Sequence, residues 1–246
     1  MSNPDTNKTS LKQKAVWFKE KVVTILTMGM LRQFNRHKMV NLDHVVTDEY
    51  NPIVFLGNHA EIYGPIASAL CFPIPVRFWV ISRMMFNKKD VRAYLYENTF
   101  SKKTFLPVFV RKLLAWYLGW LSVNIMNSLR AIPVYRDSPM KLRQTLRESV
   151  EALEHGENLM IFPEHPEGKY VKGGISELSP GFMMLAEAWW KKSGKKLRFM
   201  PVYANREKRT FTFGNEIVYE PGNGYASEQE RVLKDAYEQL VSLSEL

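Results

Sequence analysis

The chain has 246 residues, of which 46% are hydrophobic and 24% charged, and this composition excludes a protein that is disordered over most of its length. Its single cysteine, Cys71, can form no internal disulfide, which excludes a small disulfide-stapled scaffold and predicts a reducing compartment. The net charge of +9 is concentrated in residues 1–40 and 71–137, where basic residues adjoin long apolar runs. This pattern favours an anionic membrane surface over nucleic acid as the partner.

Residues 1–45 are predicted to be a basic, amphipathic, helical segment that docks on the membrane. Apolar residues recur at helical spacing along one side of it, namely Leu11, Ala15, Phe18, Val22 and Ile25, with lysines around them. Such a helix lies either in the lipid headgroup region or against the domain, and the two interpretations are compatible. The longest uncharged stretch, Leu113–Leu129, is shorter than the roughly 20 residues that a spanning helix needs. We therefore expect a cytoplasmic protein attached peripherally to the inner face of the membrane.

Residues 46–246 are predicted to form one α/β domain. Short apolar runs bounded by turn residues predict strands over 52–57, 131–135, 158–162, 197–203 and 210–218. Apolar stripes with suitable caps predict helices from Pro139 to a cap at Gly156, over 181–192, and over about 228–243 with Ser227 and Glu230 as a capping box. Strands that alternate with helices predict a mixed, largely parallel sheet flanked by helices.

Unusual polar residues follow three of the predicted strands. Asn58, His59 and Glu61 follow the first, Arg136 follows the second, and Glu164, His165 and Glu167 follow the third. The carboxyl ends of parallel strands meet at one edge of a sheet, so a base, an anion clamp and an orienting acid could converge there. Each group also has a purely structural explanation: Asn58-His59 as a helix cap and Arg136 as a surface ion pair. Glu164, His165 and Glu167 are suitable metal ligands, but without a cysteine partner or a helical HExxH spacing we expect no metal.

Taken in order, these segments resemble the glycerolipid acyltransferase family, typified by the 1-acylglycerol-3-phosphate acyltransferases. The family block NHxxxxDP corresponds to residues 58–65, its strand-ending arginine to Arg136, its FPEGTR block to residues 162–167, and its Val/Ile-Pro strand to residues 199–202. The order and spacing agree from about residue 50 to 220. The resemblance implies an acyltransferase-like fold in which histidine deprotonates an acceptor hydroxyl that attacks an acyl thioester, while an aspartate orients the imidazole.

Two departures from the family pattern change the expected site. Gly64 stands where the family has its aspartate, and His165-Pro166-Glu167 stands where it has Gly-Thr-Arg. Either Glu61 turns inward to replace the missing acid, or Glu164 or Glu167 reaches His59 from another strand, with Glu61 preferred over Glu164.

The resulting hypothesis is an acyltransferase that moves a fatty acyl group from acyl-CoA or acyl carrier protein, which are substrates rather than cofactors, to a hydroxyl or amine. His59 would be the general base with Glu61 or Glu164, and Asn58, Arg136 and His165 would bind the substrate. Residues 62–86 would line an acyl tunnel or belong to the core. The alternatives are a non-catalytic protein that binds lipid at the membrane surface on a degenerate acyltransferase fold, and a metal-dependent hydrolase centred on His59, His165 and Glu164.

Overall fold

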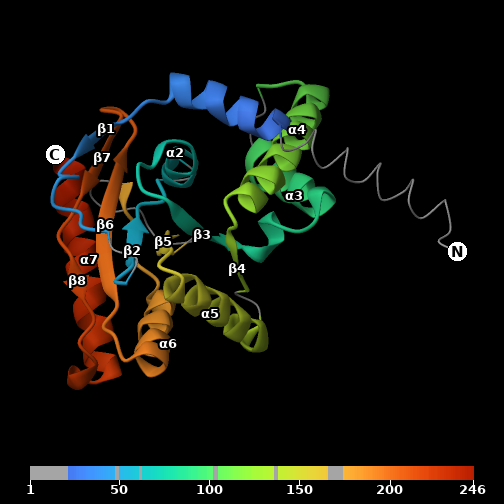
Figure 1. Ribbon diagram of the computed structural model, residues 1–246. Coiled ribbons are helices and arrows are strands. Elements are labelled where there is room, and N and C mark those ends of the chain that lie inside the picture. The colour runs from blue at the N-terminus through green and yellow to red at the C-terminus, as the bar shows by residue number, and fades with distance from the viewer. Residues whose placement is uncertain (1–21, 48–49, 61–62, 102–104, 136–137, 166–173) are drawn as a thin grey trace, which may run out of the picture. The chain divides into compact units, whose positions relative to one another are not determined.

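The computed structural model describes residues 22–47, 50–60, 63–101, 105–135, 138–165 and 174–246 (Figure 1). The chain divides into two compact units: the first comprises Met1–Phe34 and Val80–Arg130, and the second comprises Asn35–Trp79 and Ala131–Leu246. Residues 22–34 are helical, whereas the rest of the predicted N-terminal helix lies outside the described residues. A strand within the segment 1–45, β1 (Lys38–Val40), belongs to the second unit and not to a helical appendage. Within the described parts of the chain, no helix has the length and hydropathy to cross a bilayer.

The second unit is built around a sheet with the strand order β1-β7-β6-β2-β5-β3-β4 and with β8 also paired to β6. The strands are β1 (Lys38–Val40), β2 (Ile53–Gly57), β3 (Val76–Ile81), β4 (Ile132–Val134), β5 (Asn158–Ile161), β6 (Arg198–Asn205), β7 (Thr210–Phe213) and β8 (Ile217–Val218). β2 runs parallel to both β5 and β6, β3 runs parallel to β5, and β1 runs parallel to β7. β6 pairs antiparallel with β7 and β8. The prediction of a mixed, largely parallel sheet flanked by helices is therefore confirmed.

Helices cover both faces of this sheet, and successive strand residues alternate between them. Val54 and Leu56 of β2 face a core formed with α5 (Pro139–Glu154), α6 (Met183–Ser193) and α7 (Tyr225–Glu245). Phe55 points to the other face, where its ring contacts Phe72 at the end of α2 (Tyr63–Cys71) and Phe213 of β7. Burial on both faces explains why β2, β5 and the middle of β6 are continuous apolar runs.

The helix ends follow local chemistry that is visible in the sequence. Ser138 caps α5, its hydroxyl accepting a hydrogen bond from the Lys141 N–H, and Pro139 occupies the first turn. Gly156 and Gly194 both have positive φ, 71° and 66°, just after α5 and α6. The predicted ends of these two helices are confirmed, except that the first turn of the second is a 3-10 turn at Pro180–Phe182.

The prediction of a single strand over 210–218 is wrong, because this segment contains one residue more than the partner strand can match. β7 pairs Phe213 with Val202, whereas β8 pairs Ile217 with Phe199, so four residues advance on one side for three on the other. This is a β-bulge between the two strands. Gln239 of α7 accepts the hydrogen bond of the bulge residue Asn215 N–H at 2.7 Å, which compensates for the broken ladder.

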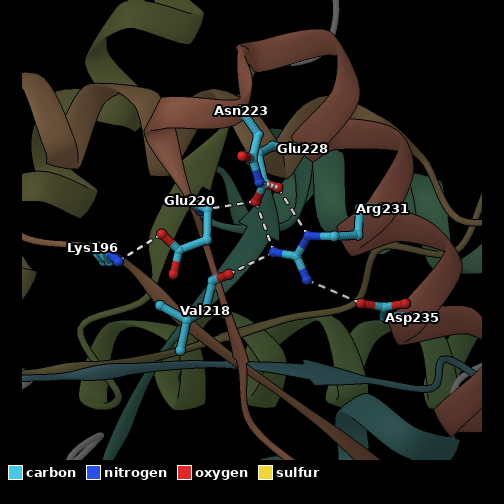
Figure 2. Close-up of polar contacts among 7 residues, drawn as sticks. All are labelled: Lys196, Val218, Glu220, Asn223, Glu228, Arg231 and Asp235. Atoms are coloured by element: carbon cyan, nitrogen blue, oxygen red, sulfur yellow. Dashed lines mark hydrogen bonds and ion pairs between the residues drawn. The ribbon is translucent and has the colours of Figure 1, made fainter.

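The start of α7 is also different from the predicted capping box, because Ser227 and Glu230 do not mark its first residue. The helix begins at Tyr225, and Glu228 in its first turn supplies a carboxylate that accepts hydrogen bonds from neighbouring groups (Figure 2). The Glu228 side chain is 1% exposed and accepts hydrogen bonds from the Glu220 N–H and the Asn223 amide at 2.8 Å each, and from Arg231. These contacts anchor α7 to the segment that follows β8.

The first unit contains the helix at 22–34, α3 (Lys88–Leu95) and α4 (Val108–Ser128), with a 3-10 turn at Ser82–Met84 and a π-helical turn at Tyr96–Phe100. α3 and α4 meet at Gly119, where an added Cβ would lie 2.6 Å from Cγ of Arg92. The Arg92 guanidinium then donates a hydrogen bond to the Trp116 carbonyl and lies 5.0 Å from the centre of the Trp116 ring. A glycine at the crossing thus allows the two helices to pack closely.

Candidate active site

The candidate site lies at the edge of the sheet where β2, β5 and β6 end. Because these strands are parallel neighbours, His59 after β2, Glu164 after β5 and Tyr203 near the end of β6 are brought to the same edge. This is the position at which open α/β sheets bind their ligands. The first and third sequence blocks, more than 100 residues apart in the chain, therefore converge as expected.

Asn58 holds the end of β2 against β6. Its side chain is completely buried, with Oδ1 accepting the Ala204 N–H at 2.7 Å and Nδ2 donating to the Ala204 carbonyl at 3.3 Å. The amide side chain thus pairs with Ala204 as one more residue of β2 would. This geometry positions the following histidine, and it gives no support to the prediction that Asn58 itself binds substrate.

Glu164 is a buried carboxylate that joins the two loops at this edge. Its side chain is 4% exposed. Oε1 accepts the main-chain N–H of His59 at 2.5 Å, and Oε2 accepts the N–H and the hydroxyl of Ser176 at 3.1 and 3.2 Å. Three donors satisfy the two oxygens, as a buried charge requires. Glu164 thus contacts the main chain of His59, and its role in this geometry is to fix the histidine backbone.

The ring of His59 stands half-buried against an aromatic side chain. Its centre lies 6.0 Å from that of Phe162 in an edge-to-face arrangement, and Phe162 in turn stacks on Phe78 of β3. The main-chain carbonyl of His59 accepts the Gly64 N–H, so both of its backbone groups are fixed. Glu61, the preferred orienting acid, lies outside the described residues, and its role as partner of the imidazole stays a prediction.

The turn from His59 into α2 requires two unusual backbone features. Ala60 has φ of 42°, in the left-handed region that non-glycine residues rarely adopt. Gly64 approaches the Asn58 carbonyl so closely that an added Cβ would lie 1.9 Å from that oxygen. No side chain fits there without movement of the backbone. The family aspartate therefore has no room at this position in the present geometry.

The remaining predicted site residues are His165, Arg136 and Glu167. The main chain of His165 pairs with Glu177 in a short ribbon, in which Glu164 also bridges Leu178, and the His165 side chain is exposed. Arg136 and Glu167 lie outside the described residues. Within the ranges that the structure describes, no three His, Cys, Asp or Glu side chains cluster closely enough to hold a metal ion. Of the predicted tunnel segment 62–86, the described residues 63–86 divide mainly between α2, β3 and the turn that follows, with some side chains buried in the core and Ile66 and Phe86 exposed.

Three polar residues of this region were not identified by the sequence analysis. Ser176 donates hydrogen bonds from its N–H and its hydroxyl to Glu164. Tyr203 lies on β6, and burial and the charge of Glu164 raise the pKa of its phenol, which therefore stays protonated at neutral pH. Tyr63, in the first turn of α2, contacts Nε2 of His37 through its hydroxyl at 2.6 Å. Tyr203 could have been found by the strand-end rule, whereas the contacts of Ser176 and Tyr63 join residues 12 and 26 positions apart and have no local sequence signal.

The donor and the acceptor of the hydrogen bond between His37 and Tyr63 follow from the other contact of the imidazole. Nδ1 of His37 contacts the Asn35 carbonyl at 2.6 Å, and because a carbonyl can only accept, Nδ1 must carry the proton. Nε2 of the neutral ring is then an acceptor, and the Tyr63 hydroxyl, which lies 2.6 Å from Nε2 and 3.5 Å from the Asn205 carbonyl, donates to the nearer of the two. Burial, the largest effect, and the charge of Arg209 lower the pKa of His37. The pair fastens α2 to the segment before β1 with the imidazole neutral.

Comparison with known proteins adds no assignment to this geometry, because no family model matches the chain and no curated protein matches it significantly.

Proposed function

We propose that the protein is an acyltransferase that transfers a fatty acyl group from an acyl thioester, acyl-CoA or acyl carrier protein, to a hydroxyl or amine of a lipid-type acceptor. One observation carries the proposal: Glu164 of the third block bonds the main chain of His59 of the first block at 2.5 Å. Two segments that resemble the first and third blocks of one enzyme family thus form a single polar site at the carboxyl edge of the sheet. The half-buried ring of His59 stands at that edge.

In the proposed reaction, His59 acts as the general base. Its imidazole takes the proton of the acceptor hydroxyl while the oxygen forms a bond to the thioester carbon. The tetrahedral intermediate then collapses, the C–S bond breaks, and the proton passes to the leaving thiolate. Glu164 contributes by fixing the histidine main chain, and Glu61 remains the proposed partner of the ring. Arg136 is proposed to bind an anionic group of the acceptor.

We further propose a peripheral association with an anionic membrane surface at the cytoplasmic side, since a lipid acceptor and a fatty acyl chain both partition there. No metal takes part in the proposed reaction. The charge distribution supports this location: residues 80–130 carry nine lysines and arginines against two acids, whereas the second unit carries 19 against 21. Positive charge thus gathers in one unit instead of spreading over the surface.

A second candidate, a non-catalytic lipid-binding protein, is favoured by Gly64. The 1.9 Å approach to Asn58 leaves no space for the acid that family members use to orient the imidazole. If Glu61 does not supply that acid, His59 would bind lipid carbonyls without transferring an acyl group.

The two candidates are separated by measuring thiol release from palmitoyl-CoA with mixed lysophospholipids as acceptors, together with mass spectrometry of the acylated product. We expect turnover by the wild type and a loss of at least a hundredfold in His59→Ala. His155→Ala is the matched control, because His155 lies exposed at the end of α5 and its ring contacts the Glu151 carbonyl. Equal product formation by the wild type and His59→Ala would contradict the catalytic proposal, and wild-type lipid binding without product would favour the second candidate.

A further inference from the structure

The first unit exposes an apolar surface on the N-terminal half of α4. Phe109, Leu113 and Trp116 follow one another at steps of four and three residues, so they lie on one side of the helix. They are 72%, 62% and 52% exposed. Val108 and Lys112 flank them on one side and Tyr117 on the other, and all three are exposed. We call these six residues the α4 face.

A neighbouring side of the same helix is packed within the unit. Ala115 and Gly119 are buried, and Gly119 lies against Arg92 of α3. The α4 face is therefore not the inner side of a loosely packed helix, because α4 already has an inner side. A helix that is apolar on both sides is expected either in a core or at an apolar interface.

Exposed apolar side chains are also unevenly distributed between the two units. Among the described residues, 13 of the 21 large hydrophobic side chains that are exposed belong to the first unit, which is the smaller of the two. A patch of this kind on a soluble protein marks an interaction surface.

We propose that the α4 face is the surface that inserts into the interface of an anionic lipid membrane, with α4 lying in the plane of the membrane. The positive charge of this unit favours an anionic lipid membrane over a protein partner. Lys112 lies within the α4 face, Lys88 and Lys89 begin α3, and residues 80–130 carry a net charge of +7. Tryptophan and tyrosine beside lysine is the combination that suits the headgroup region, where an amphipathic ring is half immersed and a lysine extends its amine to the phosphates.

The length of the face fits insertion in the plane but not across the membrane. From Val108 to Tyr117 the helix rises roughly 15 Å, about half of the thickness of the hydrocarbon layer. Further along α4, the apolar residues Leu121, Val123 and Ile125 are buried. This inference deepens the proposed function, since it names α4 as a docking element of a membrane-associated acyltransferase, in addition to residues 1–45.

The test measures binding of the full chain to vesicles of phosphatidylcholine with 30% phosphatidylglycerol, without any turnover. The double variant Phe109→Ser, Leu113→Ser should bind at least tenfold more weakly than the wild type. The matched control is Val46→Ser, Met140→Ser, because Val46 and Met140 of the second unit are 66% and 84% exposed and equally apolar. Circular dichroism checks that both variants are folded, which their exposure predicts.

A second readout locates the inserted residue. Brominated lipids should quench the intrinsic fluorescence of the bound wild type, and Trp116→Phe should lose part of this quenching while it keeps a ring for Arg92. Unchanged vesicle binding by the double variant would overturn the proposal, as would a change of oligomeric state in sedimentation without a change in vesicle binding. Failure of the acyltransferase proposal would leave these results unaffected, because a non-catalytic lipid-binding protein would dock in the same way.

Discussion

The main-chain N–H of His59 donates its hydrogen bond to Oε1 of Glu164, which lies 105 residues later in the chain. The other oxygen of the same carboxylate accepts hydrogen bonds from the N–H and the hydroxyl of Ser176. One side chain thus sets the path of two loops at the candidate site. A change of this carboxylate should therefore affect the geometry of His59 as well as the stability of the unit.

Glu164→Gln should lower the free energy of unfolding by about 2 kcal/mol, because a charge-assisted set of three hydrogen bonds loses its charge and one acceptor becomes a donor. We also expect turnover to fall tenfold or more, mainly in kcat. Urea unfolding and acyl-transfer kinetics measure the two effects. Glu177→Gln, an exposed neighbour on the same ribbon, serves as the control. Full activity in Glu164→Gln would mean that the histidine does not depend on this link.

Gly64→Asp should fail to restore a family-like site. The new Cβ would lie 1.9 Å from the Asn58 carbonyl, so the backbone must move at a cost of about 3 kcal/mol, and Gly64→Ala should cost nearly as much. Thermal unfolding compares both variants with Gly222→Ala, where an added Cβ meets nothing within 4 Å. An active Gly64→Asp with wild-type stability would show that this position has room for an acid after all.

The contact between His37 and Tyr63 predicts a loss of stability at mildly acidic pH. Because the pKa of His37 is lowered, the unfolded chain binds a proton more readily than the folded one as pH falls below the ordinary value of 6.5. Stability should then decrease until pH passes the folded pKa. NMR titration should place His37 below 6.5, and Tyr63→Phe should raise its pKa, because the hydroxyl stabilises the neutral ring. A value for His37 at or above 6.5 would contradict the assigned direction of this hydrogen bond.

Glu228 predicts a second, more acidic transition. Hydrogen bonds from Arg231, the largest effect, lower the pKa of this carboxyl to about 2 (Figure 2). Its contribution to stability is therefore complete above the ordinary pKa near 4.5 and is lost as pH falls from there towards 2. Glu228→Gln should reduce the free energy of unfolding by about 2–3 kcal/mol at pH 7 and by much less at pH 3. Exposed Glu230 on the same helix gives the control Glu230→Gln, which should change stability by less than about 0.5 kcal/mol.

The elements predicted correctly are those whose signal is local. β2 and β5 are apolar because both faces are covered, and α5 and α6 carry caps within one turn of their ends. The sequence analysis did not predict β1 and β3, for two different reasons. β1 has three residues and exists through its pairing with β7 about 170 positions later, whereas β3 interrupts its apolar run with Arg77. α4 was considered only as a membrane span, because its apolar residues surround the helix and give no stripe.

The site was predictable to the level of which strand ends meet, but not to the level of which atoms touch. A parallel sheet brings His59 and Glu164 to one edge by topology alone. Whether the carboxylate then bonds the ring or the main chain depends on the turn at Ala60 and on Ser176, and neither has a sequence signature. Gly64 was visible as a departure from the family pattern, but its cause, the close approach to Asn58, exists only in three dimensions.

The extra residue between β7 and β8 makes the number of residues in this segment as important as their identity. Phe211 and Phe213 point to the side of α2, and in an unbroken strand Ile217 would do the same. The bulge turns Ile217 to the opposite side, into the core with α7. Removing Asn215 would therefore exchange the inward and outward side chains of everything up to Tyr219, whereas replacing it by another residue would leave the order intact. A one-residue deletion here should abolish folding even though Asn215 is itself exposed and bonds Gln239 through its backbone N–H.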